Sequence, residues 1–252
     1  MYPYLAIFLA GWIAAGLINY LADFLPIERR LVLPYCKSCG EKIPILYYFL
    51  LPLRCPRCRQ GRRMRAWLLY PIYILIGYWL WQNPSPKLGF LLSWLICLYF
   101  GVVVVIDLEH RLILHVVSLA GAILGFWAGW EQRGVLPTLF GGVAGFGMMY
   151  VIYLGGIGFL RLLSRKRQYG EIDEALGFGD VMLAGVTGLL LGWPGIVVGL
   201  ALAVFLAGVV SLILLAALAL RRQYRPGATI AYGPYIVASA FILIFLKNVV
   251  IP

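Results

Sequence analysis

The stretch GIVVGLALAVFLAGVVSLILLAALAL, residues 195–220, contains no charged side chain. A helix of about 20 apolar residues crosses the hydrocarbon core of a bilayer, so this stretch predicts a transmembrane helix. The whole chain has the same character, since 63% of its 252 residues are hydrophobic, 12% are charged and the mean hydropathy is +0.91. A water-soluble domain cannot bury that much apolar surface. The sequence therefore predicts a polytopic membrane protein.

About eight apolar segments are predicted to span the membrane. Continuous apolar runs favour an all-α protein, because the strands of a membrane barrel alternate apolar and polar residues. The first segment has no basic n-region and no small-residue cleavage site, so we expect a retained helix rather than a signal peptide. The predicted helices cover residues 4–24, 67–82, 88–106, 112–130, 135–161, 179–192, 195–220 and 230–250. The predicted domains are a first transmembrane helix at 1–26, a polar loop domain at 27–66, and a seven-helix core at 67–252.

The net charge of +11 comes from basic residues that gather in four polar segments, 27–66, 107–112, 161–178 and 221–229. Only Lys87, Arg133 and Lys247 lie elsewhere. Because cytoplasmic loops are rich in Lys and Arg, these segments are predicted to face the cytoplasm and both termini the outside of the cell membrane. This topology, together with contact to anionic lipids, explains the charge, and we expect no nucleic-acid partner.

The polar loop domain at 27–66 carries two CxxC pairs, Cys36 with Cys39 and Cys55 with Cys58. Two such pairs match the tetrahedral coordination of structural zinc, and four cysteine ligands would close the site. Two disulfides are the alternative, but thiols stay reduced in the cytoplasm, where this loop is predicted to lie. The loop is too short for a large core, so the metal would supply its folding energy. Cys97 lies in an apolar run and is interpreted as a packing residue.

Two acidic residues lie at the ends of apolar runs. Asp107 ends the run FGVVVVID and Asp180 opens the predicted helix 179–192. Two predicted crossings separate them, so both are expected at the same membrane face, where an ionisable group is a functional candidate. The alternatives for each acid alone are an interfacial anchor or a helix cap. The remaining acids outside this region are expected to be surface groups, namely Asp23, Glu28, Glu41, Glu131, Glu171 and Asp173.

Together the two acids suggest acid–base chemistry. Two carboxylates held close together cannot both ionise easily, so one would serve as general base for water and the other as general acid. Gly177 and Gly179 precede Asp180 and, lacking side chains, would let a substrate backbone approach it. Helix packing in lipid is the alternative reason for these glycines. His110 and His115 flank Asp107, and both are interpreted as interfacial residues rather than bases or metal ligands.

In the order of its motifs the chain resembles the bacterial type IV prepilin peptidases, membrane aspartyl proteases of the G-x-G-D type. The likeness extends over nearly the whole chain. It is carried by GLINYLADFLP with Gly16, Asn19 and Pro26, by the double CxxC, by IDLEHRLIL with Asp107, by EALGFGD with Glu174, Gly177, Gly179 and Asp180, and by AYGPYIVASA with Gly233 and Pro234.

The resemblance implies that Asp107 and Asp180 are the catalytic pair of an aspartic endopeptidase. Such enzymes remove the leader of type IV prepilin-like precursors at the cytoplasmic face, and many then methylate the new N-terminus with S-adenosylmethionine. This chain departs from the family pattern at Ile113-Leu114-His115, which lacks the usual proline, and at Met182, where many members have lysine. The acid that often follows the family's Tyr-Pro is also absent, since Tyr70-Pro71 is followed by Ile72, so methylation stays open.

Two other classes of protein are alternatives to the peptidase. In a proton- or cation-coupled transporter, Asp107 and Asp180 would bind the ion and the cysteine loop would be a regulatory zinc module. Transporter sites, however, lie near the membrane midplane, whereas these acids lie near helix ends. A non-enzymatic assembly factor that docks a cytoplasmic partner would explain the zinc but would leave both acids without a role.

Overall fold

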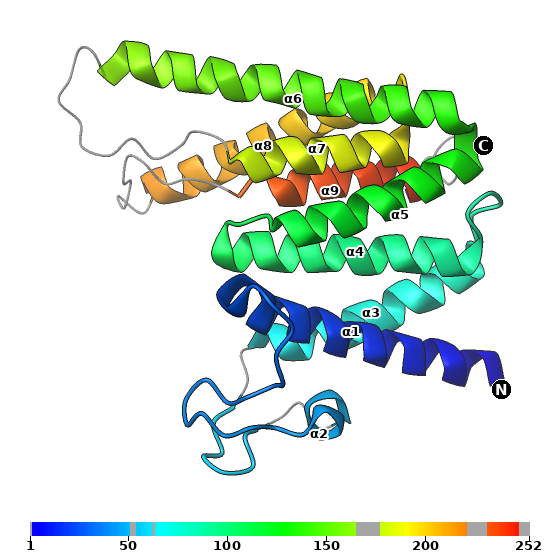
Figure 1. The fold of residues 1–252 in the computed structure, drawn as a ribbon, viewed down its shortest axis with the longest axis vertical. Helices are drawn as coiled ribbons and strands as arrows, with labels where there is room; N and C mark the ends of the chain where they lie inside the picture. Colours follow the sequence, from blue (N-terminus) through cyan, green and yellow to red (C-terminus); the bar gives the residue numbers. More distant parts are fainter. Residues whose placement is uncertain (1, 51–53, 62–63, 165–176, 221–230, 247–252) are drawn as a thin grey trace. The chain divides into compact units, whose positions relative to one another are not determined.

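The computed structural model describes residues 2–50, 54–61, 64–164, 177–220 and 231–246. These residues form helices and no β-strand (Figure 1). The helices are α1 (Tyr2–Glu28), α2 (Ile45–Leu50), α3 (Met64–Gln82), α4 (Gly89–His110), α5 (His115–Arg133), α6 (Val135–Ser164), α7 (Phe178–Leu191), α8 (Gly195–Leu220) and α9 (Gly233–Phe241), which continues into the π-helical turn η1 (Ile242–Leu246).

The all-α prediction is confirmed, and every predicted membrane segment overlaps a helix, although residues 230 and 247–250 of the last segment lie outside the described residues. Among the described residues, α1, α4, α6 and α8 are long and apolar enough to cross a membrane. α7 and the α9–η1 segment are apolar but shorter. α3 and α5 have 19 residues each and are not among the four helices that could cross a membrane. Runs such as the four valines in α4 form helix because lipid offers no other partner to backbone N–H and C=O groups.

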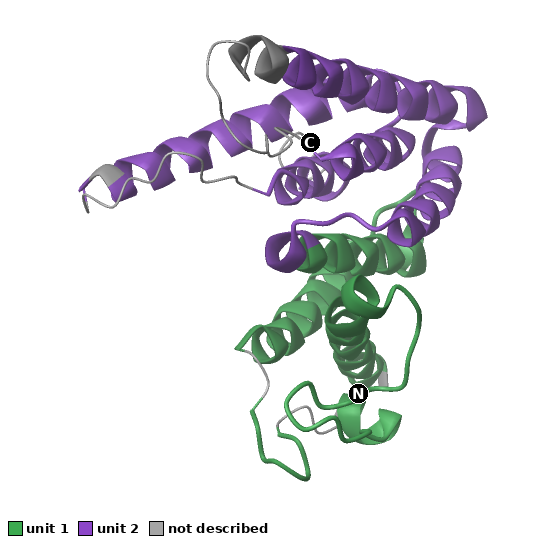
Figure 2. Ribbon diagram, turned by 60° about the vertical axis from the view of Figure 1, so that its left-hand side comes forward, with its two compact units in different colours: residues 1–106 green, residues 107–252 purple. Residues whose placement is uncertain are grey.

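The chain divides into two compact units, residues 1–106 and 107–252 (Figure 2). The boundary falls inside α4, immediately before Asp107. The two units are defined by the packing of the chain, so the predicted domain limits at residues 26 and 66 stay a prediction.

In the first unit, α1 packs along α3, and the loop with α2 follows α1. Buried side chains bond the backbone of neighbouring helices. Asn19 Nδ2 donates to the Ala66 carbonyl (3.3 Å) and Tyr73 Oη donates to the Cys97 carbonyl (2.8 Å). Cys97 itself is buried in α4, in agreement with a packing role.

Asp23 contradicts the expectation of a surface carboxylate. Its side chain is largely buried and accepts hydrogen bonds from Tyr48 Oη (2.7 Å) and from Arg65 Nη2 (2.7 Å). Lys37 Nζ lies 3.7 Å from the same carboxylate. Asp23 therefore joins the end of α1 to the first CxxC turn, to α2 and to the start of α3, contacts that the linear sequence does not reveal.

In the second unit, α7 lies at the centre and contacts α5, α6, α8 and α9 (Figure 1). Most of its side chains are buried, among them Asp180, Leu183, Ala184 and Leu190. The close packing of α6 on α7 uses small residues, as is common between helices in membranes. A central helix surrounded by four others holds its first turn in a defined position, and that turn contains Asp180.

Candidate active site and metal centre

Asp107 lies in the last turn of α4 and is 5% exposed. Its Oδ2 accepts a hydrogen bond from the backbone N–H of Gly233, the first residue of α9, at 3.0 Å. A Cβ at position 233 would lie 2.6 Å from this oxygen, closer than real Cβ atoms come. A side chain at position 233 would therefore displace the Asp107 carboxylate. Gly233 belongs to the AYGPY motif, but its contact with Asp107 is visible only in the fold.

Asp180 is the third residue of α7 and is 8% exposed. The positive end of a helix favours an anion at this position. The Oδ1 of Asp180 has no hydrogen-bond partner among the described residues. Its carboxylate interacts electrostatically with Asp107 and with Tyr232. The second unit thus contains two buried acids that come from different helices and lie close enough for their charges to interact.

The two glycines before Asp180 lie in different surroundings. A Cβ at Gly177 would lie 3.7 Å from Asp180 Oδ2, so this backbone borders the carboxylate. A Cβ at Gly179 would lie 2.7 Å from Ile113 Cβ, so Gly179 has a packing reason to lack a side chain. Their role in substrate approach stays a prediction. Glu174, the acid of the same motif, lies outside the described residues, as do most basic residues of the 161–178 and 221–229 loops.

The segment after Asp107 keeps an extended conformation without the family's proline. Leu114 has φ −76° and ψ 136° and precedes α5. This φ is within the range that a proline ring imposes. His115 follows, is exposed, and has its Nδ1 3.3 Å from Met182 Sδ. His110 Nε2 lies 3.9 Å from Glu109 Oε2.

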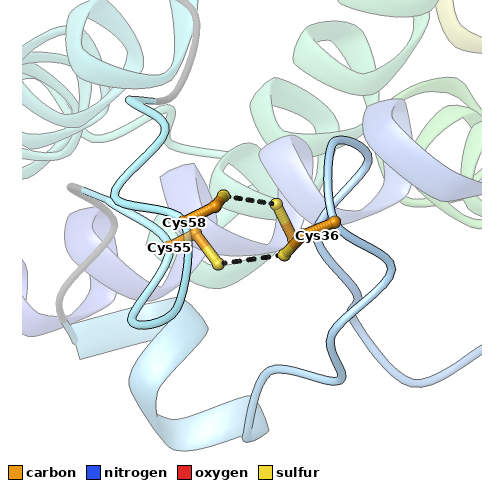
Figure 3. Close-up of side chains that lie close together, drawn as sticks. Cys36, Cys55 and Cys58 are labelled. Carbon is orange, nitrogen blue, oxygen red and sulfur yellow. Dashed lines mark hydrogen bonds between the residues drawn. The ribbon is translucent and has the colours of Figure 1, made fainter.

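The four cysteines of the polar loop converge (Figure 3). Each CxxC pair lies in a turn closed by an isolated backbone bridge, Tyr35 with Lys42 and Arg54 with Gly61. All four sulfurs lie within 4.8 Å of one another, and no disulfide joins them. The shortest pairs run between the two turns, 3.6 Å for Cys36 and Cys58 and 3.7 Å for Cys39 and Cys55. Tetrahedral zinc with Zn–S bonds of about 2.3 Å separates its sulfurs by about 3.8 Å, so the cluster fits such an ion.

The thiols affect one another's protonation. Burial raises the pKa of the Cys36 thiol, but the backbone N–H groups of Cys39 and Ser38 and the nearby thiols lower it to about 6. The backbone N–H of Gln60 lowers the pKa of Cys58, but burial and the neighbouring thiols raise it to about 12. Four thiols this close do not all ionise alone, and a bound cation would favour the tetrathiolate form.

Comparison with known proteins places the chain among membrane-embedded peptidases. The model of the type IV leader peptidase family matches residues 89–214, half of the chain. The chain therefore belongs to the type IV leader peptidase family. A curated prepilin leader peptidase/N-methyltransferase of Pseudomonas putida is 25% identical over 221 residues, which cover 83% of this chain and 70% of that protein. No solved structure matches. Family membership confirms the predicted resemblance and favours a peptidase over the transporter and the assembly factor.

Proposed function

We propose that Asp107 and Asp180 form the catalytic pair of an aspartic endopeptidase that removes the leader from type IV prepilin-like precursors. The observation that carries the proposal is the convergence of these two buried carboxylates, which interact electrostatically within one compact unit. The family match covers both residues. The substrate class comes from the name of the P. putida relative.

In this mechanism one carboxylate is ionised and takes a proton from water, while the other is protonated and donates to the scissile carbonyl or the leaving amine. The pair titrates as a unit, so neither role is assigned to one residue alone. Gly233 N–H orients Asp107 by its hydrogen bond to Oδ2. Asp180 Oδ1 is buried and has no partner among the described residues, and in this mechanism the bound water or the substrate supplies that partner.

The proposal also assigns a membrane face to the catalytic end and a metal ion to the cysteine cluster. We assign the catalytic end to the cytoplasmic face of the bacterial inner membrane, with both chain termini outside, because the basic loops lie next to both acids in the sequence. We assign Zn²⁺ to Cys36, Cys39, Cys55 and Cys58, where it would stabilise the polar loop and take no part in hydrolysis. N-methylation with S-adenosylmethionine is the second reaction to test, since the relative's name includes it.

The test is cleavage of a purified model prepilin in detergent, followed by intact mass. Wild type is compared with Asp107→Asn and Asp180→Asn, and with Glu109→Gln as an acid on the same helix without an assigned role. Loss of a general acid or base lowers rates roughly 10²- to 10⁴-fold, so both Asn variants should leave the precursor intact while Glu109→Gln cuts it. Folded Asn variants that still cut would overturn the proposal. A further methyl mass on the product with S-adenosylmethionine would establish the second reaction.

A further inference from the structure

Tyr232 lies at the start of α9, where that helix meets both candidate acids. It is the N-cap residue of α9, and the N–H of the next residue, Gly233, bonds Asp107 Oδ2 at 3.0 Å. The same glycine also faces α7, because a Cβ there would lie 3.5 Å from Leu183 Cδ2. Leu183 is three residues after Asp180 and is therefore on the same face of α7. The backbone at Tyr232 consequently passes close to both acids.

The side chain of Tyr232 is close to Asp180 and is not tied to another group. Its ring is half-buried, and its phenol interacts electrostatically with the Asp180 carboxylate. The ring of Tyr235, one turn further along α9, lies 6.4 Å from it, centroid to centroid. The Tyr232 hydroxyl makes no hydrogen bond to another described residue, and it is not among the enclosed polar atoms that lack a partner. It is therefore an accessible hydrogen-bond donor beside the acid pair.

Hydrolysis beside this pair calls for a donor that the acids do not supply. When water attacks a peptide bond, negative charge develops on the scissile carbonyl oxygen, and donors held in position stabilise that charge. An ionised carboxylate only accepts hydrogen bonds, so a pair that shares one proton can donate once. The N–H of Gly233 is already bonded to Asp107. A phenol is neutral at ordinary pH and can donate to the oxygen without adding charge to the site.

We propose that the hydroxyl of Tyr232 donates a hydrogen bond to the scissile carbonyl oxygen of the precursor. The inference rests on the proposed function and adds a third catalytic side chain to Asp107 and Asp180. The phenol keeps its proton throughout, so the proton transfers of the acid pair are unchanged. The bond strengthens as the oxygen gains negative charge, and therefore Tyr232 acts on kcat rather than on KM.

Two matched substitutions test the hydroxyl by kinetics. Tyr232→Phe removes only this oxygen, and Tyr235→Phe makes the same change on the half-buried ring that packs against it. We expect Tyr232→Phe to lower kcat for precursor cleavage about 100-fold with little change in KM, as loss of one such donor does. Tyr235→Phe should cut like the wild type. A wild-type kcat for Tyr232→Phe, or a raised KM with kcat unchanged, would overturn the proposal.

Binding of a transition-state analogue gives a second readout, which does not depend on how much of the variant folds. The probe is a precursor peptide with a secondary alcohol in place of the scissile carbonyl. Its dissociation constant should rise about tenfold or more in Tyr232→Phe and stay at the wild-type value in Tyr235→Phe, because such analogues report contacts made in the transition state. Equal constants for Tyr232→Phe and wild type would overturn the proposal. Failure of the proposed function would look different, since the wild type itself would not cut.

Discussion

At the scale of single residues, the proposed active site depends on one backbone contact. Asp107 lies at the end of α4, and the N–H that bonds its Oδ2 comes from Gly233 at the start of α9. A bond of this kind fixes the rotamer of a carboxylate before the substrate arrives. Gly233 is therefore expected to act by positioning Asp107 rather than by touching the substrate.

Gly233→Ala is expected to lower kcat about 100-fold with little change in KM. The new Cβ would lie 2.6 Å from Asp107 Oδ2 and must displace it, and a displacement of about 1 Å can cost two orders of magnitude in rate. Steady-state cleavage of the precursor measures the effect. Gly208→Ala is the control, because a Cβ there meets no atom of the described residues within 4 Å. A wild-type kcat for Gly233→Ala would show that this contact has no role in positioning.

At the scale of structural elements, the two cysteine turns have the same backbone plan. In each, the residue after the second cysteine adopts a left-handed conformation, Gly40 at φ 71° and Arg59 at φ 55°. Each donates its N–H to the first cysteine's carbonyl, Gly40 to Cys36 at 2.8 Å and Arg59 to Cys55 at 3.0 Å. A side chain in this conformation costs about 1–2 kcal/mol, so the second turn is the more strained of the two.

Arg59→Gly should stabilise the second turn by about 0.5–1 kcal/mol, since glycine removes the steric cost but adds unfolded-state entropy. The measurement is the equilibrium loss of bound zinc to a competing chelator. We expect the variant to retain metal at several-fold higher chelator concentration. Gly40→Ala, the reciprocal change, should release it sooner. Equal affinities for all three proteins would contradict this account of the turns.

The entry into α5 allows a second test at this scale. Leu114 already has a φ within the range of proline, and Ile113 before it lies outside the helices. Leu114→Pro should therefore raise the free energy of unfolding by about 0.4–1 kcal/mol, because proline lowers the conformational entropy of the unfolded chain. The thermal midpoint in detergent measures it. Ile123→Pro, in the interior of the same helix, should cost about 3 kcal/mol. A lower midpoint for Leu114→Pro would mean that this segment is not compatible with the family's proline.

At the scale of the whole molecule, removal of the metal should destabilise the polar loop but not the membrane helices. One zinc per chain is expected in native mass spectra, and none in Cys55→Ser protein. Loss of metal should expose residues 31–61 to proteases while the helices stay intact, because the loop has little core of its own. Cys97→Ala is the control, since this buried cysteine lies in α4 outside the cluster. Protease resistance that survives complete removal of zinc would contradict a structural role.

The sequence by itself determined the helices, the pair of CxxC motifs and the two candidate acids. Apolar runs long enough for a bilayer have few conformations open to them, because lipid forces each backbone group to bond within its own segment. The spacing within each CxxC pair is likewise local. These features require no knowledge of which segments meet, and among the described residues a helix overlaps each predicted segment and the four cysteines converge.

The tertiary structure alone decided which groups surround the acids and the loop. Two examples are the Gly233 N–H bonded to Asp107 and the Asp23 carboxylate between Lys37, Tyr48 and Arg65. Both depend on contacts between segments that lie far apart in the chain. In lipid, helix association depends on small residues, close packing and individual hydrogen bonds rather than on an apolar pattern. An apolar run therefore predicts where a helix lies in the sequence, but only the packed structure decides which of its faces meets which neighbour.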